Sequence, residues 1–268
     1  MQGKVASRFK QPRMSFGRRV SVPGCDDAPV VSVAMANAYK PVTLIYPYYE
    51  NPDMLKRQIE HWRGLPVTYR ECLSAIIVDD GSPDVPAVQV LADEAMPFPV
   101  KLFRIEVDVR WNWIAARNLA MSKASGWCIL TDIDHVVPEG TIYACLHGDH
   151  DPDTIYRFMR KEHTGDPVHP HPNSWMMTAD MFWRVGGYDE AFSGHYGTDG
   201  EYRRRCVGTA PIRILSNHLV RYERVGDSST VRYLRKQPED AAVGRIIAAR
   251  GTDWKPKVLT YPFHEVAL

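Results

Sequence analysis

The feature that most constrains the fold is a regular alternation of β-rich apolar runs and helical stretches between residues 41 and 135. The runs expected to form strands are 42–46, 73–78, 100–105 and 127–131. A helix is expected to begin at Asn51-Pro52, and a second, amphipathic one covers 112–125. Such alternation predicts an α/β fold, with a mostly parallel sheet and helices on both of its faces.

Acidic residues follow two of these strands. Asp79 and Asp80 come after the second strand, and Asp132 and Asp134 come after the fourth. An isolated D-x-D after a strand more often forms a turn than a site. Ligands of open α/β sheets bind beyond the carboxyl ends of the strands, however, and acids from separate strands would meet there. Asp132 and Asp134 leave the same side of the backbone, so together they could hold a divalent cation and the phosphates that it carries.

Composition excludes several classes of protein. The 268 residues suffice for one large α/β domain. With 33 basic and 32 acidic residues, the chain has no net charge that would attract it to nucleic acid or to an anionic membrane. Five scattered cysteines without a C-x-x-C pair argue against a disulfide framework or a zinc knuckle. We find no apolar run long enough for a membrane span and no signal-peptide core, and therefore expect reduced thiols in a cytoplasmic protein.

Three regions are expected along the chain. Residues 1–38 form a basic arm in which six cations precede the first acidic residue. The arm is expected to be a partly disordered tail, or else to contact phosphate, a partner subunit or the domain itself. A catalytic domain over 39–226 follows, divided into halves at 39–136 and 137–226. Residues 227–268 are predicted to be a C-terminal helical extension.

The second half of the domain alternates less regularly. Its stretch 147–173 is rich in His and Pro and is predicted to form long loops around one strand; a second metal site there is disfavoured, because the spacing matches no structural zinc pattern. Further expected elements are a strand at 154–160, helices at 179–185, 202–206 and 238–250, and late strands at 212–215 and 219–223 with His218 between them.

Several motifs occur in a fixed order between residues 42 and 206. They are Pro47-Tyr48-Tyr49-Glu50-Asn51, Ile76-Ile77-Val78-Asp79-Asp80-Gly81-Ser82, Ala115-Ala116-Arg117-Asn118, Asp132-Ile133-Asp134, Gly186-Gly187-Tyr188-Asp189-Glu190 and Gly197-Thr198-Asp199-Gly200-Glu201. This series resembles the GT-A fold glycosyltransferases of family 2. Two positions depart from the family pattern: the usual Glu-Asp pair reads Thr198-Asp199, and His135 stands where another Asp is common.

The resemblance implies a GT-A, Rossmann-like sheet with an irregular acceptor-side C-terminal half. It implies transfer of a sugar from a nucleoside diphosphate sugar, UDP being the commonest nucleotide, with inversion at the anomeric carbon. Mn²⁺ or Mg²⁺ would be held by Asp134 with help from Asp132, and His218 is either a third ligand or an ordinary surface histidine. Asp199 is the expected base that takes the proton of the acceptor.

The resemblance also assigns residues to the two substrates. The donor side comprises Pro47, Tyr48, Glu50, Asp79, Arg117 and Asp132, and the acceptor side Trp175, Tyr188, Tyr196 and Glu201. Asp79 would bind the nucleotide base, and Arg117 would pair with phosphate or with one of the acids, unless it is an ordinary cation on a helix. The three aromatic residues would stack on sugar or pack in the core, and Glu201 would orient Asp199 or the acceptor, or simply begin a helix.

Two other functions stay open at this point. A nucleotidyltransferase of related fold would open with a glycine-rich phosphate loop, where this chain has Pro47-Tyr48-Tyr49-Glu50. A non-catalytic nucleotide-sugar binder would account for the missing glutamate at Thr198, although the retained Asp199 argues against it. The acceptor is open among glycan, protein, small molecule and nucleic acid, and a homo-oligomer is compatible with the sequence.

Overall fold

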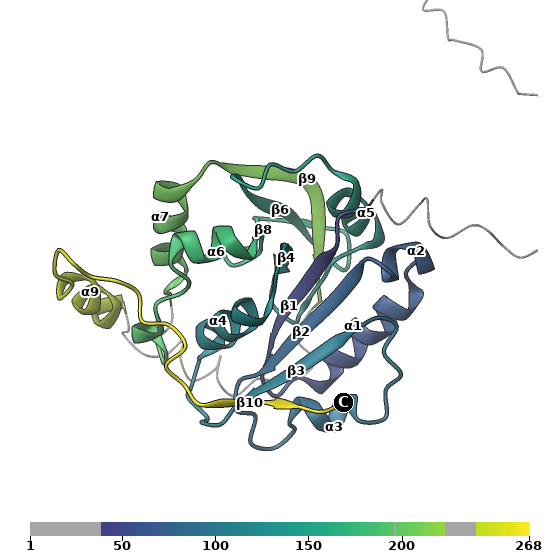
Figure 1. The fold of residues 1–268 in the computed structure, drawn as a ribbon, viewed down its shortest axis with the longest axis horizontal. Helices are drawn as coiled ribbons and strands as arrows, with labels where there is room; N and C mark the ends of the chain where they lie inside the picture. Colours follow the sequence, from purple (N-terminus) through teal and green to yellow (C-terminus); the bar gives the residue numbers. More distant parts are fainter. Residues whose placement is uncertain (1–38, 196, 223–239) are drawn as a thin grey trace, which may run out of the picture.

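The structure is a computed structural model that describes residues 39–195, 197–222 and 240–268 (Figure 1). The predicted basic arm therefore lies outside the described residues, as does Tyr196.

The described residues form a ten-stranded mixed sheet with the order β10-β3-β2-β1-β4-β8-β6-β9-β5, and β7 pairs with β6. The strands are β1 (Val42–Tyr48), β2 (Leu73–Asp79), β3 (Val100–Ile105), β4 (Trp127–Leu130), β5 (His135–Val136), β6 (Ile155–Glu162), β7 (Pro167–Val168), β8 (Trp175–Thr178), β9 (Ile212–Arg221) and β10 (Phe263–Val266). The neighbours β3, β2, β1 and β4 run parallel, which confirms the predicted parallel core. Antiparallel β8 and β10 flank this core.

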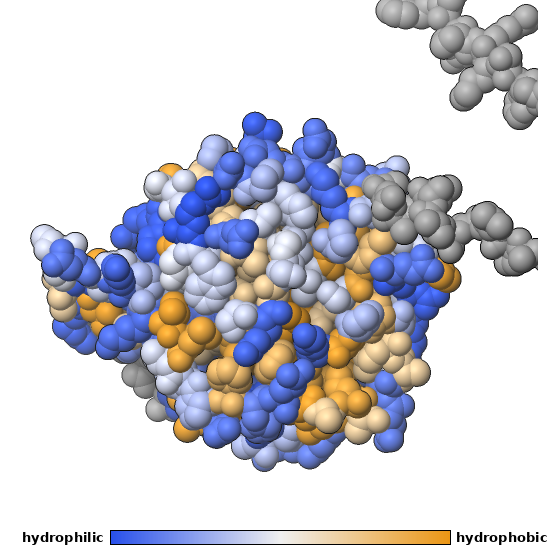
Figure 2. Space-filling view, in the orientation of Figure 1, coloured by the Kyte–Doolittle hydropathy of each residue, from blue (hydrophilic) through white to orange (hydrophobic). Residues whose placement is uncertain are grey.

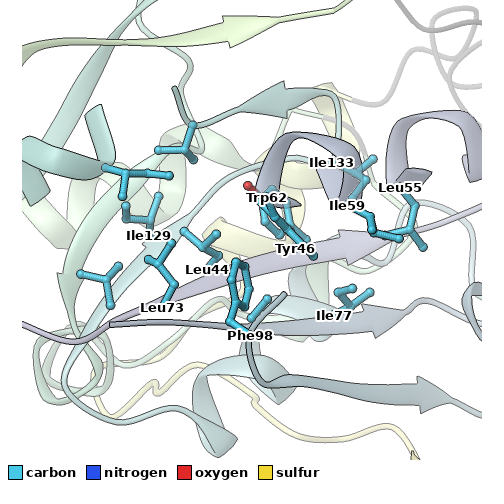
Figure 3. Packing of buried hydrophobic residues seen from close by; sticks show 14 of the residues in the cluster. Leu44, Tyr46, Leu55, Ile59, Trp62, Leu73, Ile77, Phe98, Ile129 and Ile133 are labelled. Carbon is cyan, nitrogen blue, oxygen red and sulfur yellow. The ribbon is translucent and has the colours of Figure 1, made fainter. Parts of the chain in front are cut away.

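Helices cover both faces of the sheet (Figure 1). They are α1 (Pro52–Gly64), α2 (Val67–Arg70), α3 (Ala87–Leu91), α4 (Trp113–Lys123), α5 (Glu139–His147), α6 (Ala179–Val185), α7 (Asp199–Thr209) and α9 (Asp240–Ala248), with a 3₁₀ turn η1 at Glu190–Phe192. Successive residues of a strand point to opposite faces. Leu44 and Tyr46 accordingly pack with α1, α3 and α5, while Ile45 packs with α4, α6 and α7. Figure 3 shows the first of these clusters around Trp62.

Some elements differ from the expected ones because pairing partners extend them. Pro47 and Tyr48, predicted to lie in a loop, are the last residues of β1, since Tyr48 still pairs with Asp79 of β2. The two late strands expected around His218 are one strand, β9, whose pairing with β6 shifts register between Phe158 and Met159. His218 therefore lies within a strand and not in a loop.

The C-terminal residues join the central sheet, which the sequence does not reveal. Strand β10 pairs antiparallel with β3, whereas the predicted C-terminal extension contained a helix at 238–250 and no strand. Ahead of β10, the main-chain N–H groups of Leu259 and Thr260 donate to the buried carboxylate of Glu190, both at 2.7 Å. Arg250, beyond the end of α9, pairs with Asp189 at 2.8 Å and with Glu201 at 2.9 Å. These contacts bind the C-terminal segment to the turn at 186–190 and to α7.

The four cysteines within the described ranges are free thiols: Cys72, Cys128, Cys145 and Cys206. Burial raises the pKa of Cys128 to about 12, so its thiol is an inert part of the core. Among the helices that the structure describes, none combines the length and the apolar character needed to cross a membrane.

Candidate active site

The carboxylates of Asp132 and Asp134 lie just beyond the end of β4. Their side chains are 29% and 14% exposed, so both can be reached from solvent. Asp132 is held from two sides: Arg117 donates from Nη2 to Oδ1 at 2.7 Å, and His171 Nε2 lies 3.2 Å from Oδ2. The predicted D-x-D therefore forms a polar site that is already ordered by neighbouring side chains.

His171 is a neutral partner of Asp132. Its burial lowers its pKa to about 4, despite the opposing attraction of Asp132. At neutral pH its contact with Asp132 is therefore a hydrogen bond and not an ion pair. An ionised carboxylate only accepts hydrogen bonds, so Nε2 carries the hydrogen and Nδ1 accepts from the Ser174 hydroxyl at 3.1 Å.

His135 orients Asp134 in a similar way. Its ring is 1% exposed, and its Nδ1 lies 2.7 Å from Asp134 Oδ1. Arg160 Nη1 approaches His135 Nε2 at 3.3 Å, and because a guanidinium only donates, Nε2 must accept. Nδ1 then carries the hydrogen and donates to Asp134. A histidine that fixes a ligating carboxylate in this manner is a common feature of metal sites.

The donor set here fits a divalent cation. Ligand atoms of Asp132, Asp134 and His135 all lie within 4.8 Å of one another. Both ring nitrogens of His135 are engaged by Asp134 and Arg160, so the available donors are the carboxylate oxygens of Asp132 and Asp134, which suit Mn²⁺ and Mg²⁺. Among the residues that the structure describes, His218 is not part of this group. The group of ligand atoms within 4.8 Å of one another does not include the His218 ring, so this geometry gives no support to His218 as a third ligand.

Arg117 is an interior residue, with 0% of its side chain exposed. Besides Asp132, it donates from Nη1 to the carbonyl of Asn173 at 2.5 Å and to Tyr188 Oη at 3.2 Å, and its guanidinium lies 4.9 Å from the centroid of the Trp113 ring. Of the alternatives open from the sequence, pairing with an acid is therefore confirmed. Arg117 is neither a surface cation nor accessible to phosphate in this structure.

Replacing Arg117 by Met should lower the free energy of unfolding by about 3 kcal/mol, because Asp132 and the Asn173 carbonyl both lose a charged donor. The measurement is urea denaturation. Arg63→Met is the matched control, because Arg63 pairs with Glu94 at the surface and should lose less than about 1 kcal/mol. Equal losses in the two variants would contradict an interior structural role for Arg117.

Asp199 is the first residue of α7. Its Oδ1 accepts from Asn173 Nδ2 at 2.6 Å. Burial raises the pKa of Asp199 above the usual value of 3.8, and the negative charge of Asp132 raises it further. The hydrogen bond from Asn173 and the positive charge of Arg117 both lower it. The exposed residues of the same helix include Arg203 and Arg204, and Figure 2 shows hydrophilic residues over this end of the molecule. The helix thus presents one half-buried carboxylate toward Asp132, and a raised pKa suits a group that must take up a proton.

The expected donor-side residues before β2 mostly serve the protein itself. Tyr48 is buried and donates to the Val85 carbonyl at 2.7 Å. Glu50 accepts from the main-chain N–H of Asp84 at 3.0 Å and of Val85 at 3.1 Å. Pro47 is buried within β1. Tyr48 and Glu50 thus hold the loop between β2 and α3 in place, so their effect on a donor would be exerted through the position of that loop.

Asp79 is also occupied, and its neighbour Asp80, which bonds Asn112, is occupied in part. Asp79 accepts from the main-chain N–H of Ser82 and of Ala87, both at 2.8 Å, and pairs with Arg104 at 3.1 Å. The carboxylate of Asp79 thus organises the loop, and the binding of the nucleotide base by Asp79 stays a prediction. Among the described residues, Asp80 Oδ1 is buried without a hydrogen-bond partner, and burial raises the pKa of Asp80 well above its usual range.

The acceptor-side aromatic residues lie in the core. Trp175 is 0% and Tyr188 2% exposed, because β8 runs between β4 and β6 in the middle of the sheet and Tyr188 stacks on Tyr202 at 3.9 Å. Neither can stack on a sugar in this structure, and Tyr196 lies outside the described residues. Glu201 is 5% exposed and holds Arg205 and Arg250 instead of facing Asp199.

Sequence reasoning missed the residues that connect these groups. His171, Asn173 and Ser174 belong to the loop before β8. The first two lie within the His- and Pro-rich stretch 147–173, which is predicted to form long loops, and Ser174 follows it directly. They contact Asp132, Asp199 and the Thr131 hydroxyl. A cluster of His and Asn between two strand-like runs was the available signal, but without knowledge of the strand order it could not be assigned to the site.

Comparisons with known proteins agree with this architecture. The family model described as "Glycosyl transferase family 2" matches residues 43–217, which is well over half of the chain. No curated protein matches the sequence.

Solved structures of similar fold include TarS 1–349 of S. aureus in complex with UDP-GlcNAc, at a TM-score of 0.59 and 17% identity over 78% of this chain and 65% of that one. A second is the mannosyltransferase PcManGT from Pyrobaculum calidifontis in complex with GDP-Man and Mn²⁺, with a TM-score of 0.56 and 17% identity over 82% of this chain and 66% of that one. A third is GalNAc-T7 with UDP, GalNAc and Mn²⁺, with a TM-score of 0.54 and 14% identity over 74% of this chain and 48% of that one. At such low identity, these likenesses establish the fold alone.

The family match begins in β1, passes through the D-x-D and α7, and ends within β9, so it includes both acidic groups of the site. The GT-A architecture of the solved structures agrees with the described sheet. This chain therefore belongs to glycosyl transferase family 2.

Proposed function

We propose that this protein transfers a sugar from a nucleoside diphosphate sugar, most simply a UDP-sugar, to an acceptor hydroxyl with inversion at the anomeric carbon. The observation that carries the proposal is the placement of two acidic groups from distant parts of the chain around one buried cation. Asp132 contacts Arg117 directly, and Asp199 is joined to Arg117 through Asn173.

The residues divide into a leaving-group side and a base side. Asp134, oriented by His135, and Asp132 would hold Mn²⁺ or Mg²⁺, which when bound supplies a Lewis acid to the departing diphosphate. Asp199 accepts the proton of the acceptor hydroxyl as that oxygen attacks the sugar, and its raised pKa favours this transfer. The partner-free oxygen of Asp80 is a candidate to bind the nucleotide, because a donor from the ligand would satisfy a buried acceptor.

The solved structures of similar fold support the donor class. TarS was solved with UDP-GlcNAc and PcManGT with GDP-Man and Mn²⁺, so both uridine and guanosine donors belong in the first experiment. This chain spans 65% of the TarS chain, and the acceptor is not identified by the likeness. The cytoplasmic location and the homo-oligomer stay predictions from the sequence.

The test is release of nucleoside diphosphate from a panel of UDP- and GDP-sugars, with and without Mn²⁺, using water and a set of glycan and small-molecule acceptors. Metal-stimulated release from at least one donor is expected. Binding of donors without release under any of these conditions would contradict the proposal and would favour a non-catalytic binder. Formation of a nucleotide sugar from a sugar 1-phosphate and a nucleoside triphosphate would instead indicate a nucleotidyltransferase.

A further inference from the structure

Four groups of the site form one continuous chain of hydrogen bonds. Arg117 Nη2 donates to Asp132 Oδ1 at 2.7 Å, and Arg117 Nη1 donates to the Asn173 carbonyl at 2.5 Å. Asn173 Nδ2 then donates to Asp199 Oδ1 at 2.6 Å. Asp132 follows β4, Arg117 lies on α4, Asn173 precedes β8 and Asp199 begins α7. The chain thus joins elements that are distant in sequence.

We propose that Asn173 is a positioning residue that holds the carboxylate of the base, Asp199, at a fixed position relative to the donor-side carboxylate, Asp132. Arg117 fixes the main chain of Asn173, and the side-chain amide of Asn173 fixes Asp199. This inference rests on the proposed function, because it assigns Asp199 the role of base.

The orientation of the Asn173 amide follows from charge. An ionised carboxylate can only accept, so the NH₂ group of Asn173 must face Asp199, and the reverse orientation would oppose two acceptor oxygens. In the orientation found, Asn173 Oδ1 is buried without a partner among the described residues, and the side chain is only 7% exposed. An unpaired buried acceptor costs free energy, and the short hydrogen bond to a charged group offsets that cost.

The amide also acts on the proton affinity of Asp199. Burial raises the pKa of Asp199, and among the groups that oppose this rise the Asn173 hydrogen bond is the largest. The charged groups that face Asp199 are Asp132, which raises its pKa, and Arg117, which lowers it. Without the amide, Asp199 should therefore hold its proton to a higher pH and be ionised less often when an acceptor arrives.

Asn173→Ala separates this role from a purely structural one, because it removes the amide and leaves the main-chain carbonyl that Arg117 binds. The titration of Asp199 is followed by ¹³C NMR of the full chain labelled at the aspartate carboxyl carbon, and Asp199→Asn assigns the signal. The Asp199 signal should titrate at higher pH in Asn173→Ala than in wild type. Asn217→Ala is the matched control, since its amide bonds the Gly140 carbonyl at 3.4 Å away from this chain of contacts, and it should leave the titration unchanged.

The kinetic arm measures nucleoside diphosphate release against pH. Asn173→Ala should release diphosphate about 10- to 100-fold more slowly than wild type at low pH, and the deficit should shrink as the pH rises. Asn173→Asp keeps the shape of the side chain and replaces the alanine variant if that variant does not fold. Its carboxylate repels that of Asp199, so the pKa of Asp199 should again rise and diphosphate release should again be slower at low pH. An unchanged Asp199 titration in a folded variant, or a deficit independent of pH, would overturn the inference. The NMR experiment needs no substrate. If the wild-type protein shows no turnover, the proposed function is refuted, but the titration of Asp199 still decides whether Asn173 positions it.

Discussion

Asp199→Asn is expected to lower the rate of sugar transfer about 10³-fold, because general base catalysis contributes on that order and the amide cannot take up a proton. The wild-type rate should fall as the pH drops through the pKa of Asp199, which burial of the carboxyl raises above the usual value of 3.8. This acidic limb should be absent from the residual activity of the variant. Nucleoside diphosphate release over a range of pH measures both effects.

The stability of Asp199→Asn provides the control. Because the pKa of Asp199 is higher in the folded protein than in the unfolded chain, the folded protein binds more protons, and its stability falls as the pH rises through that range. Replacing the carboxylate by a neutral amide removes this cost, so the melting temperature at neutral pH should be unchanged or higher. A variant that melts well below wild type would attribute the lost activity to misfolding and not to the missing base.

Asp134→Asn should have a similarly large effect through a different property. Asp134 is the carboxylate that His135 orients, and Asp132 is already engaged with Arg117 and His171, so Asp134 is the proposed main ligand for a metal ion. We expect weaker binding of Mn²⁺ and a rate about 10³-fold lower, since stabilisation of the leaving group is worth several kcal/mol. Isothermal titration with Mn²⁺ and diphosphate release measure the two quantities.

A surface acid shows whether the effect is specific. Asp93 is exposed after α3, and Asp93→Asn should leave Mn²⁺ affinity and rate unchanged. Retention of wild-type Mn²⁺ affinity by Asp134→Asn would contradict the assignment of the D-x-D as the metal site. A rate that is insensitive to chelation in wild type would do the same.

The sequence predicts the parallel core and the acids at its edge because both depend on local patterns. The alternation of apolar runs and helical stretches gives β1, β2, β3 and β4 in their order along the chain, and Asp132 and Asp134 follow β4 directly. Strand pairing outside this region is not local. Nothing near Phe263 indicates that β10 adds to β3, and nothing near His218 shows that β9 continues past it along β6.

The interior of the site was harder to predict for a related reason. The resemblance assigns Trp175 and Tyr188 to the acceptor side as aromatic residues that could stack on a sugar, but the position of β8 inside the sheet buries Trp175. Asp79 gains Arg104 from β3 as its partner, and Asp199 gains Asn173 from a loop 26 residues earlier in the chain. Which carboxylates are free to act therefore depends on long-range contacts, and residue type and spacing alone could not separate Asp79 from Asp80.

The most direct test of the central claim, a single base facing a metal-held leaving group, is the configuration of the sugar at the moment of its release. The measurement is ¹H NMR of the anomeric proton during hydrolysis of an α-linked nucleoside diphosphate sugar, with water as the acceptor and before mutarotation. One displacement assisted by Asp199 predicts that the β-anomer forms first. First formation of the α-anomer would contradict this account.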